Sequence, residues 1–180
     1  MSFANPAGHA ATAAAAYVQA LLDRLGDRDP LEAMAEQVAW IARRTAGLDE
    51  MVLRRPEAPG KWSAIEVIQH LADSDVVAAW RTRQILTVDR PEIQGYDQDA
   101  WARTLGYAHV PLEAAMGQLR GMRASNLRVW RSLSRDQRAR VGLHAERGPE
   151  SLDLLLRLMG GHDLVHRRQI DRALDAAGAR

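Results

Sequence analysis

Residues 151–178, SLDLLLRLMGGHDLVHRRQIDRALDAAG, carry the pattern that decides the fold. Apolar side chains recur there at every third or fourth position, which is the spacing of one face of an α-helix. Ser151 is a favoured residue at a helix N-terminus, and Gly178 is favoured just beyond a C-terminus. The inward stripe comprises Leu155, Leu158, Met159, His162, Val165, His166, Ile170 and Ala173. The segment is therefore predicted to be a long helix packed in a helical core.

Four further helices are predicted upstream, each from an apolar stripe and a terminal signal. They span residues 10–25, 30–47, 64–87 and 111–133. Asp29 caps the second of these helices. Ser63 and Glu66 form a capping box at the start of the third, and Trp62 can pack against Val67 one turn later. The pattern predicts an all-α fold, a four-helix bundle with an extra N-terminal helix.

The segments between these helices are predicted to be loops, and the chain shows no convincing strand pattern. Residues 54–60, 89–110 and 134–150 form the connections before the third, fourth and last helices. A connection as long as residues 89–110 is usually functional or packs as a lid. We expect a loose N-terminus over residues 1–8 and a single helical-bundle domain over residues 9–178.

The composition is that of one globular domain. Of the 180 residues, 47% are hydrophobic and 26% are charged, which suits a single hydrophobic core. Trp80, Trp101 and Trp130 are expected in that core, with a place beside a functional site as the alternative for Trp101.

Charge and cysteine content exclude several functions. A net charge of +1, with acids and bases interleaved, gives no broad basic face for nucleic acid. No apolar stretch approaches the ~20 residues of a membrane span, and no basic residue precedes Arg24 to start a secretory signal. We therefore expect a cytoplasmic protein with no nucleic-acid or membrane partner. Because cysteine is absent, any metal must be held by imidazole and oxygen, and any thiol must come from outside the chain.

Three of the six histidines lie inside predicted helices, and two of these share one helix face. His162 and His166 are four residues apart, so their side chains project one turn apart. Roughly 0.2 such pairs would arise by chance, so the pair is informative only because both imidazoles replace apolar residues on the inward stripe. Gly160 and Gly161 permit another backbone or a ligand to approach closely. Two imidazoles so placed can share one metal ion.

His70 is the predicted third ligand, because it lies in the middle of its helix. Its neighbours at helical spacing, Glu66, Asp73, Ser74 and Val77, form a mixed face that suits a cleft wall. The capping box explains Glu66, while Asp73 either orients a ligand imidazole or lies on a solvated face. The alternative for each histidine alone is a hydrogen-bonded core residue. Three imidazoles would bind one divalent ion and leave at least one coordination position open, as in catalytic sites.

Three blocks of the sequence resemble the DinB-like, YfiT-like metalloprotein superfamily. They are residues 59–73 (PGKWSAIEVIQHLAD), 95–101 (GYDQDAW) and 161–170 (GHDLVHRRQI), within a resemblance that covers roughly residues 20–175. The resemblance implies a four-helix bundle, commonly dimeric. It also implies that His70, His162 and His166 hold zinc or nickel, with water completing the coordination shell.

The resemblance further implies three kinds of activity: transfer of a low-molecular-weight thiol such as bacillithiol or mycothiol, isomerisation with such a thiol, and metal-dependent hydrolysis. We favour thiol transfer, because hydrolysis requires a general acid or base and Asp73 is the only internal candidate near His70. Hydrolysis by a metal-activated water and a non-catalytic metal-binding dimer are the alternatives. The expected partners are the thiol, a small electrophilic substrate and a second copy of the chain. The loop with Tyr96 and Trp101 is the candidate for acceptor selectivity, and no catalytic side chain is predicted.

Overall fold

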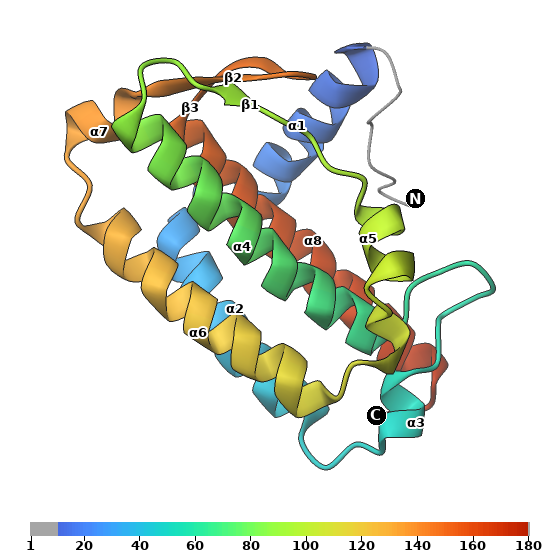
Figure 1. Ribbon diagram of the computed structural model, residues 1–180. Coiled ribbons are helices and arrows are strands. Elements are labelled where there is room, and N and C mark those ends of the chain that lie inside the picture. Colours follow the sequence, from blue (N-terminus) through green and yellow to red (C-terminus); the bar gives the residue numbers. More distant parts are fainter. Residues whose placement is uncertain (1–10, 180) are drawn as a thin grey trace.

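Four long helices set the architecture of the computed structural model, which describes residues 11–179 (Figure 1). They are α2 (Pro30–Thr45), α4 (Ala64–Thr87), α6 (Leu112–Arg131) and α8 (Leu152–Ala176). Around the bundle the order is α4, α6, α2, α8, and α1 (Ala11–Leu25) packs on the outside of α8. The predicted bundle with an extra N-terminal helix is confirmed. The loose segment predicted over residues 1–8 lies outside the described residues.

Side-chain caps fix where α2, α4 and α8 begin, as predicted. Asp29 accepts hydrogen bonds from two backbone N–H groups of the first turn of α2, at 2.7 and 3.0 Å. The Glu66 carboxylate accepts from the backbone N–H of Ser63 at 2.8 Å, which confirms the capping box of α4. Ser151 accepts from the N–H of Leu154 at 3.1 Å at the start of α8. These bonds satisfy N–H groups that have no partner within a helix. Within the described residues, no helix is long and apolar enough to cross a membrane.

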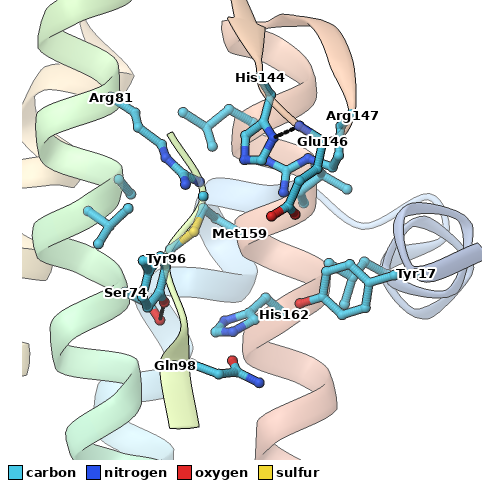
Figure 2. A pocket seen from close by; sticks show the side chains of 16 residues that line it. Tyr17, Ser74, Arg81, Tyr96, Gln98, His144, Glu146, Arg147, Met159 and His162 are labelled. Atoms are coloured by element: carbon cyan, nitrogen blue, oxygen red, sulfur yellow. Dashed lines mark hydrogen bonds between the residues drawn. The ribbon is translucent and has the colours of Figure 1, made fainter. Parts of the chain in front are cut away.

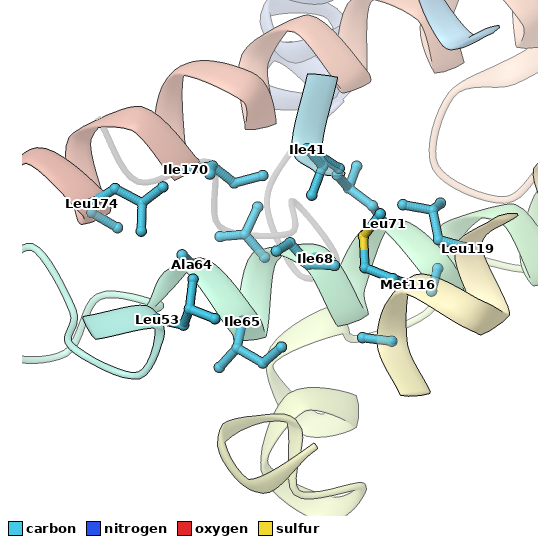
Figure 3. Close-up of a cluster of buried hydrophobic side chains, with 14 of the residues drawn as sticks. Ile41, Leu53, Ala64, Ile65, Ile68, Leu71, Met116, Leu119, Ile170 and Leu174 are labelled. Carbon is cyan, nitrogen blue, oxygen red and sulfur yellow. The ribbon is translucent and has the colours of Figure 1, made fainter. Parts of the chain in front are cut away.

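The largest apolar cluster lies where α4 meets α6 and α8 (Figure 3). Its members include Ile41, Leu53, Ile65, Ile68, Leu71, Met116, Leu119, Ile170 and Leu174. Ile68 and Leu71 of α4 and Ile170 of α8 are completely buried. Burial of such side chains contributes about 1.5–3 kcal/mol each. The two helices that carry the histidines are therefore held together by apolar packing beside the site.

A buried ionic cluster connects all four bundle helices. Arg123 of α6, 2% exposed, donates from Nε to Asp75 of α4 at 2.8 Å. Its two terminal nitrogens donate to Asp163 of α8, and one of them also donates to the Met34 carbonyl of α2 at 2.6 Å. Asn126 adds a bond to Asp75 at 3.0 Å. Buried charges are tolerated only when they are paired in this way.

A small sheet occupies parts of two predicted loops, residues 89–110 and 134–150, so the prediction that these segments are loops throughout is wrong. β1 (Glu92–Ile93) pairs in parallel with β2 (Val141–His144), and β2 pairs antiparallel with β3 (Gly148–Ser151). Strands of two to four residues are too short to show a clear alternation of polar and apolar side chains. The pairing of β1 with β2 depends on a partner about fifty residues away, which no local pattern encodes.

The irregular connections also contain short helices that the sequence pattern did not reveal. These are α3 (Glu50–Leu53), α5 (Gln98–Thr104), the 3₁₀ helix η1 (Tyr107–His109) and α7 (Arg135–Ala139). Trp130 is completely buried, as predicted, but Trp80 is 62% exposed, so its assignment to the core is wrong. Nearly every side of the first half of α4 is buried. The apolar residues of this helix therefore do not mark a single inward face, and the side on which Trp80 lies could not be predicted from them.

Candidate metal centre

The three predicted ligands come together between α4 and α8. His70, His162 and His166 are 1%, 8% and 5% exposed. The Nε2 atoms of His70 and His162 are 3.0 Å apart, and one nitrogen from each ring lies within 4.8 Å of the others. A tetrahedral ion about 2.0–2.1 Å from each ligand separates two ligand nitrogens by roughly 3.3 Å. The cluster therefore fits one divalent cation, with one ligand from α4 and two from α8.

The environment keeps all three imidazoles neutral. Burial, followed by the nearby His166, lowers the pKa of His70 and of His162 well below the ordinary value. Burial likewise lowers the pKa of His166 to about 4. Only a neutral imidazole has a nitrogen lone pair to offer a metal. At neutral pH the cluster is therefore ready to bind a cation without first losing protons.

Hydrogen bonding distinguishes these rings from ordinary core histidines. Nδ1 of His166 lies 2.8 Å from Oε1 of Gln169, an atom that only accepts, so Nδ1 carries the proton and Nε2 keeps its lone pair. Nδ1 of His70 and Nδ1 of His162 have no hydrogen-bond partner in the described part of the chain. Buried core histidines are normally satisfied by another polar group. Here the Nε2 atoms of His70 and His162 lie 3.0 Å from each other instead.

Two glycines allow the protein backbone to come close beside His162. A Cβ atom on Gly161 would lie 2.1 Å from the carbonyl oxygen of Leu21 in α1. A Cβ atom on Gly160 would lie 2.9 Å from Cα of Pro30 at the start of α2. Both distances are shorter than a side chain tolerates, so only glycine fits. The close approach expected at these glycines is therefore made by α1 and α2.

Both carboxylates that flank His70 are committed to other contacts. Glu66 caps α4 through Ser63. Asp73 is buried rather than solvated, and it accepts hydrogen bonds from the Tyr107 hydroxyl and from Gln118 Nε2 at 2.6 Å. The idea that Asp73 orients a ligand imidazole finds no support, because the hydrogen bonds of its carboxylate go to Gln69, Tyr107 and Gln118.

Two cavities adjoin the histidine cluster. The smaller, of about 100 Å³, reaches His162 and is lined by Ser74 and Tyr96 among others (Figure 2). The larger, of about 860 Å³, reaches His166, and Gln98 of α5 lines both. Ser74 connects the smaller cavity to the cluster, since its Oγ lies 3.2 Å from the Tyr96 hydroxyl and 3.5 Å from His70 Nε2. The cluster is therefore buried but bordered by space for small molecules.

The walls of the smaller cavity contain residues that the sequence analysis missed. Tyr17, Arg81, His144 and Arg147 come from α1, α4 and the β2–β3 hairpin, and no local pattern brings them together. Trp101 lines neither cavity; its ring packs on Tyr96 with centroids 4.7 Å apart. Tyr96, which the sequence placed in a selectivity loop, does line the smaller cavity.

Comparison with known proteins identifies the family. A model described as "DinB superfamily" matches residues 12–170. The chain belongs to the DinB superfamily. A relative from Geobacillus thermodenitrificans, named "Putative metal-dependent hydrolase", is 33% identical over 104 residues, or 52% of this chain and 58% of the relative. A similarly named relative from Geobacillus kaustophilus is 29% identical over 130 residues, or 71% and 73% of the two chains.

A solved structure shows the same DinB-superfamily fold. YfiT from Bacillus subtilis, described as "a probable metal-dependent hydrolase with an unusual four-helix bundle topology", matches with a TM-score of 0.78 at 22% identity. The match covers 84% of this chain and 87% of YfiT. At this identity the likeness establishes the fold alone. The metal dependence in the relatives' names agrees with the three buried histidines of this DinB-superfamily chain, which could bind a metal.

Proposed function

We propose that this DinB-superfamily chain is a metal-dependent transferase of a low-molecular-weight thiol of the bacillithiol or mycothiol type. The observation that carries the proposal is a cluster of three neutral imidazoles bordered by cavities, in which both flanking carboxylates, Asp73 and Glu66, already have hydrogen-bond partners. A histidine cluster whose two flanking carboxylates are engaged elsewhere suits a nucleophile that is activated when a bound cation lowers its pKa. We propose zinc or nickel as the ion, one per chain.

The ion would supply an open coordination position and lower the pKa of a thiol that reaches it. In the transfer, the thiol loses its proton to solvent, its sulfur bonds to the electrophilic carbon, and the leaving group, or the ring oxygen of an epoxide, takes the electrons of the broken bond. The chain's own contribution is to hold His70, His162 and His166 neutral and fixed. Ser74 and Tyr96, next to His70, are placed to hydrogen-bond a substrate in the smaller cavity.

Hydrolysis is the second candidate, and the names of the relatives favour it. In a hydrolase the same ion would lower the pKa of water instead of a thiol. The chain would then need a group to accept the water's proton. Within the described residues, Asp73 and Glu66 are hydrogen-bonded elsewhere, and Ser74, Tyr96 and Glu146 are among the polar side chains that line the smaller cavity.

A thiol panel separates these candidates. Metal-loaded protein is incubated with bacillithiol, mycothiol or glutathione and either an epoxide or a chlorodinitrobenzene, and the thioether product is quantified. We expect metal-dependent product with at least one thiol, below the free thiol's pKa of about 8.5, and none with metal-free protein. Metal-dependent cleavage of esters or amides without any thiol turnover would support hydrolysis instead. No turnover in either assay would support a non-catalytic metal-binding protein.

A further inference from the structure

We propose that the smaller cavity binds the carboxylate of a short, singly charged substrate, through Arg81 and Arg147 as cationic contacts and His144 as a neutral donor. The inference deepens the proposed function, on which it rests in one respect: a substrate in this cavity would lie beside the metal ligand His162. The binding site itself consists only of residues of this chain.

The cavity has a polar end and an apolar wall. Figure 2 shows Arg81, His144 and Arg147 gathered at one end and His162 with Ser74 at the other. Met159 lies between the two ends, and the lining also includes the apolar side chains Leu21, Val77, Leu155 and Leu158. This arrangement suits an acid whose charged group lies at the arginine end, whose hydrocarbon part packs on the wall, and whose reactive atom points towards the histidine cluster.

Arg81 is a cation without a direct ion-pair partner, although the carboxylates of Glu150 and Glu146 act on it from nearby. Its Nη2 donates to the Gln94 carbonyl at 2.8 Å, and no carboxylate of the described chain lies in ion-pair contact with it. Burial, followed by the positive charge of Arg147, lowers the pKa of Arg81, although a guanidinium remains charged at neutral pH. A partly buried cation of this kind gains from an anionic partner.

Arg147 contributes a second donor. One of its terminal nitrogens donates to Glu150 at 2.8 Å, so part of its charge is already balanced. Its Nε is buried and has no hydrogen-bond partner among the described residues. A buried donor without a partner is costly, and an acceptor atom brought by a ligand would satisfy it.

His144 provides a buried donor between the two arginines. The backbone N–H of Glu146 donates to its Nδ1 at 3.2 Å, so the proton of the neutral ring is on Nε2. The residue is 3% exposed, and Nε2 has no partner in the described part of the chain. Burial, followed by the charges of Arg147 and Arg81, lowers the pKa of His144 to about 3, so the ring remains a neutral donor.

The surrounding acids favour a monoanion over a phosphate. Glu146 lines the cavity and Glu150 pairs with Arg147, so these two carboxylates formally offset the two guanidinium groups. A singly charged carboxylate adds little excess charge, whereas a phosphate near −2 adds more. The planar guanidinium also matches a carboxylate with two parallel hydrogen bonds. A volume of about 100 Å³ is on the order of a four-carbon acid, since an engineered cavity of about 150 Å³ takes benzene.

Butyrate and butyramide are the probes, because they have nearly the same shape and differ in charge. Their dissociation constants are measured with zinc-loaded protein by ligand-observed NMR, without any thiol. We expect wild type to bind butyrate at least about tenfold more tightly than butyramide. Arg81→Met should weaken butyrate binding about tenfold and leave the zinc content unchanged. Arg83→Met is the matched control on the same helix, since Arg83 is exposed and donates to the Ala79 carbonyl outside the cavity.

Equal affinity for the two probes, or no butyrate binding, would overturn the proposal. So would wild-type butyrate affinity in Arg81→Met, because Arg81 would then contribute nothing to binding of the carboxylate. If Arg81→Met does not fold, Arg81→Gln replaces it, and the wild-type comparison of the two probes needs no variant. The assay involves no turnover, so its failure leaves the thiol-transfer proposal standing, and an absence of transferase activity leaves the carboxylate site standing.

Discussion

At the scale of single residues, Gln169 sets the chemical form of one metal ligand. Its amide oxygen accepts from Nδ1 of His166 at 2.8 Å, which leaves the lone pair of Nε2 available to a metal ion. Loss of such an orienting contact typically lowers metal affinity 10–100-fold. We therefore predict that Gln169→Ala binds zinc about tenfold to a hundredfold more weakly in a competition titration with a chromophoric chelator. Arg157→Ala, an exposed change on the same helix, is the control. Equal affinity in Gln169→Ala and Arg157→Ala would contradict the orienting role.

The clustering of the three candidate ligands could be predicted from the sequence, because two of them share one face of a single helix and interrupt its apolar stripe. The cavity residues could not. His144 falls at the end of a four-residue strand whose parallel partner is β1, so its burial depends on tertiary pairing. Arg81 and Arg147 read as ordinary surface cations, and only the packing of the β2–β3 hairpin over α4 brings them to one cavity.

At the scale of elements, Arg123 connects the helices that carry the ligands. We predict that Arg123→Met lowers the free energy of unfolding by about 3–5 kcal/mol, because Asp75 and Asp163 are left buried without a cation. Urea unfolding of the metal-free protein measures the change. Arg128→Met, an exposed change on the same helix, should cost less than about 0.5 kcal/mol. A similar small cost for Arg123→Met would show that the ionic cluster does not hold the helices in place.

The long helices were predictable and the short elements were not, for the same physical reason. Caps such as Asp29 and the Ser63–Glu66 box act within one turn, so the residues that start α2 and α4 are neighbours in the sequence. The pairs Glu92 with Leu143 and Ile93 with His144 join segments that are distant in the sequence. Such pairing is decided by packing against α4 and α8, which a local pattern does not contain.

At the scale of the whole molecule, the buried imidazoles make stability depend on pH. Burial lowers the pKa of His166 to about 4 and that of His144 to about 3, against about 6.5 in an unfolded chain. Above about pH 6.5 both states are neutral, so these groups add no pH dependence. Below it the unfolded state takes up protons that the folded state excludes, so the free energy of unfolding falls until the folded pKa is reached.

We therefore predict that metal-free protein loses roughly 1 kcal/mol per buried imidazole between about pH 7.5 and 5.5. Urea unfolding at the two pH values measures the loss. The loss of unfolding free energy between the two pH values should be smaller by roughly 1 kcal/mol in His144→Gln, which lacks one buried imidazole. It should be unchanged in His109→Gln, because His109 is exposed. A pH dependence that is the same in wild type and His144→Gln would count against a buried, neutral His144.

We also propose that the molecule is a homodimer, as the family resemblance implies. The described surface offers apolar side chains on α4, where Trp80 is 62% exposed and Val76 41% exposed. Light scattering coupled to gel filtration should give about twice the chain mass of 20.0 kDa. A mass of one chain at micromolar concentration would rule the dimer out.

Metal stoichiometry tests the three-histidine centre most directly. Wild type, His162→Ala and His144→Gln are loaded with zinc or nickel, desalted and analysed for metal by mass spectrometry, and circular dichroism checks that each variant is helical. We predict about one ion per chain in wild type and in His144→Gln, and nearly none in folded His162→Ala, because two remaining imidazoles hold the ion too weakly. Bound metal that is the same in His162→Ala as in wild type would contradict the assignment of His70, His162 and His166 as the metal ligands.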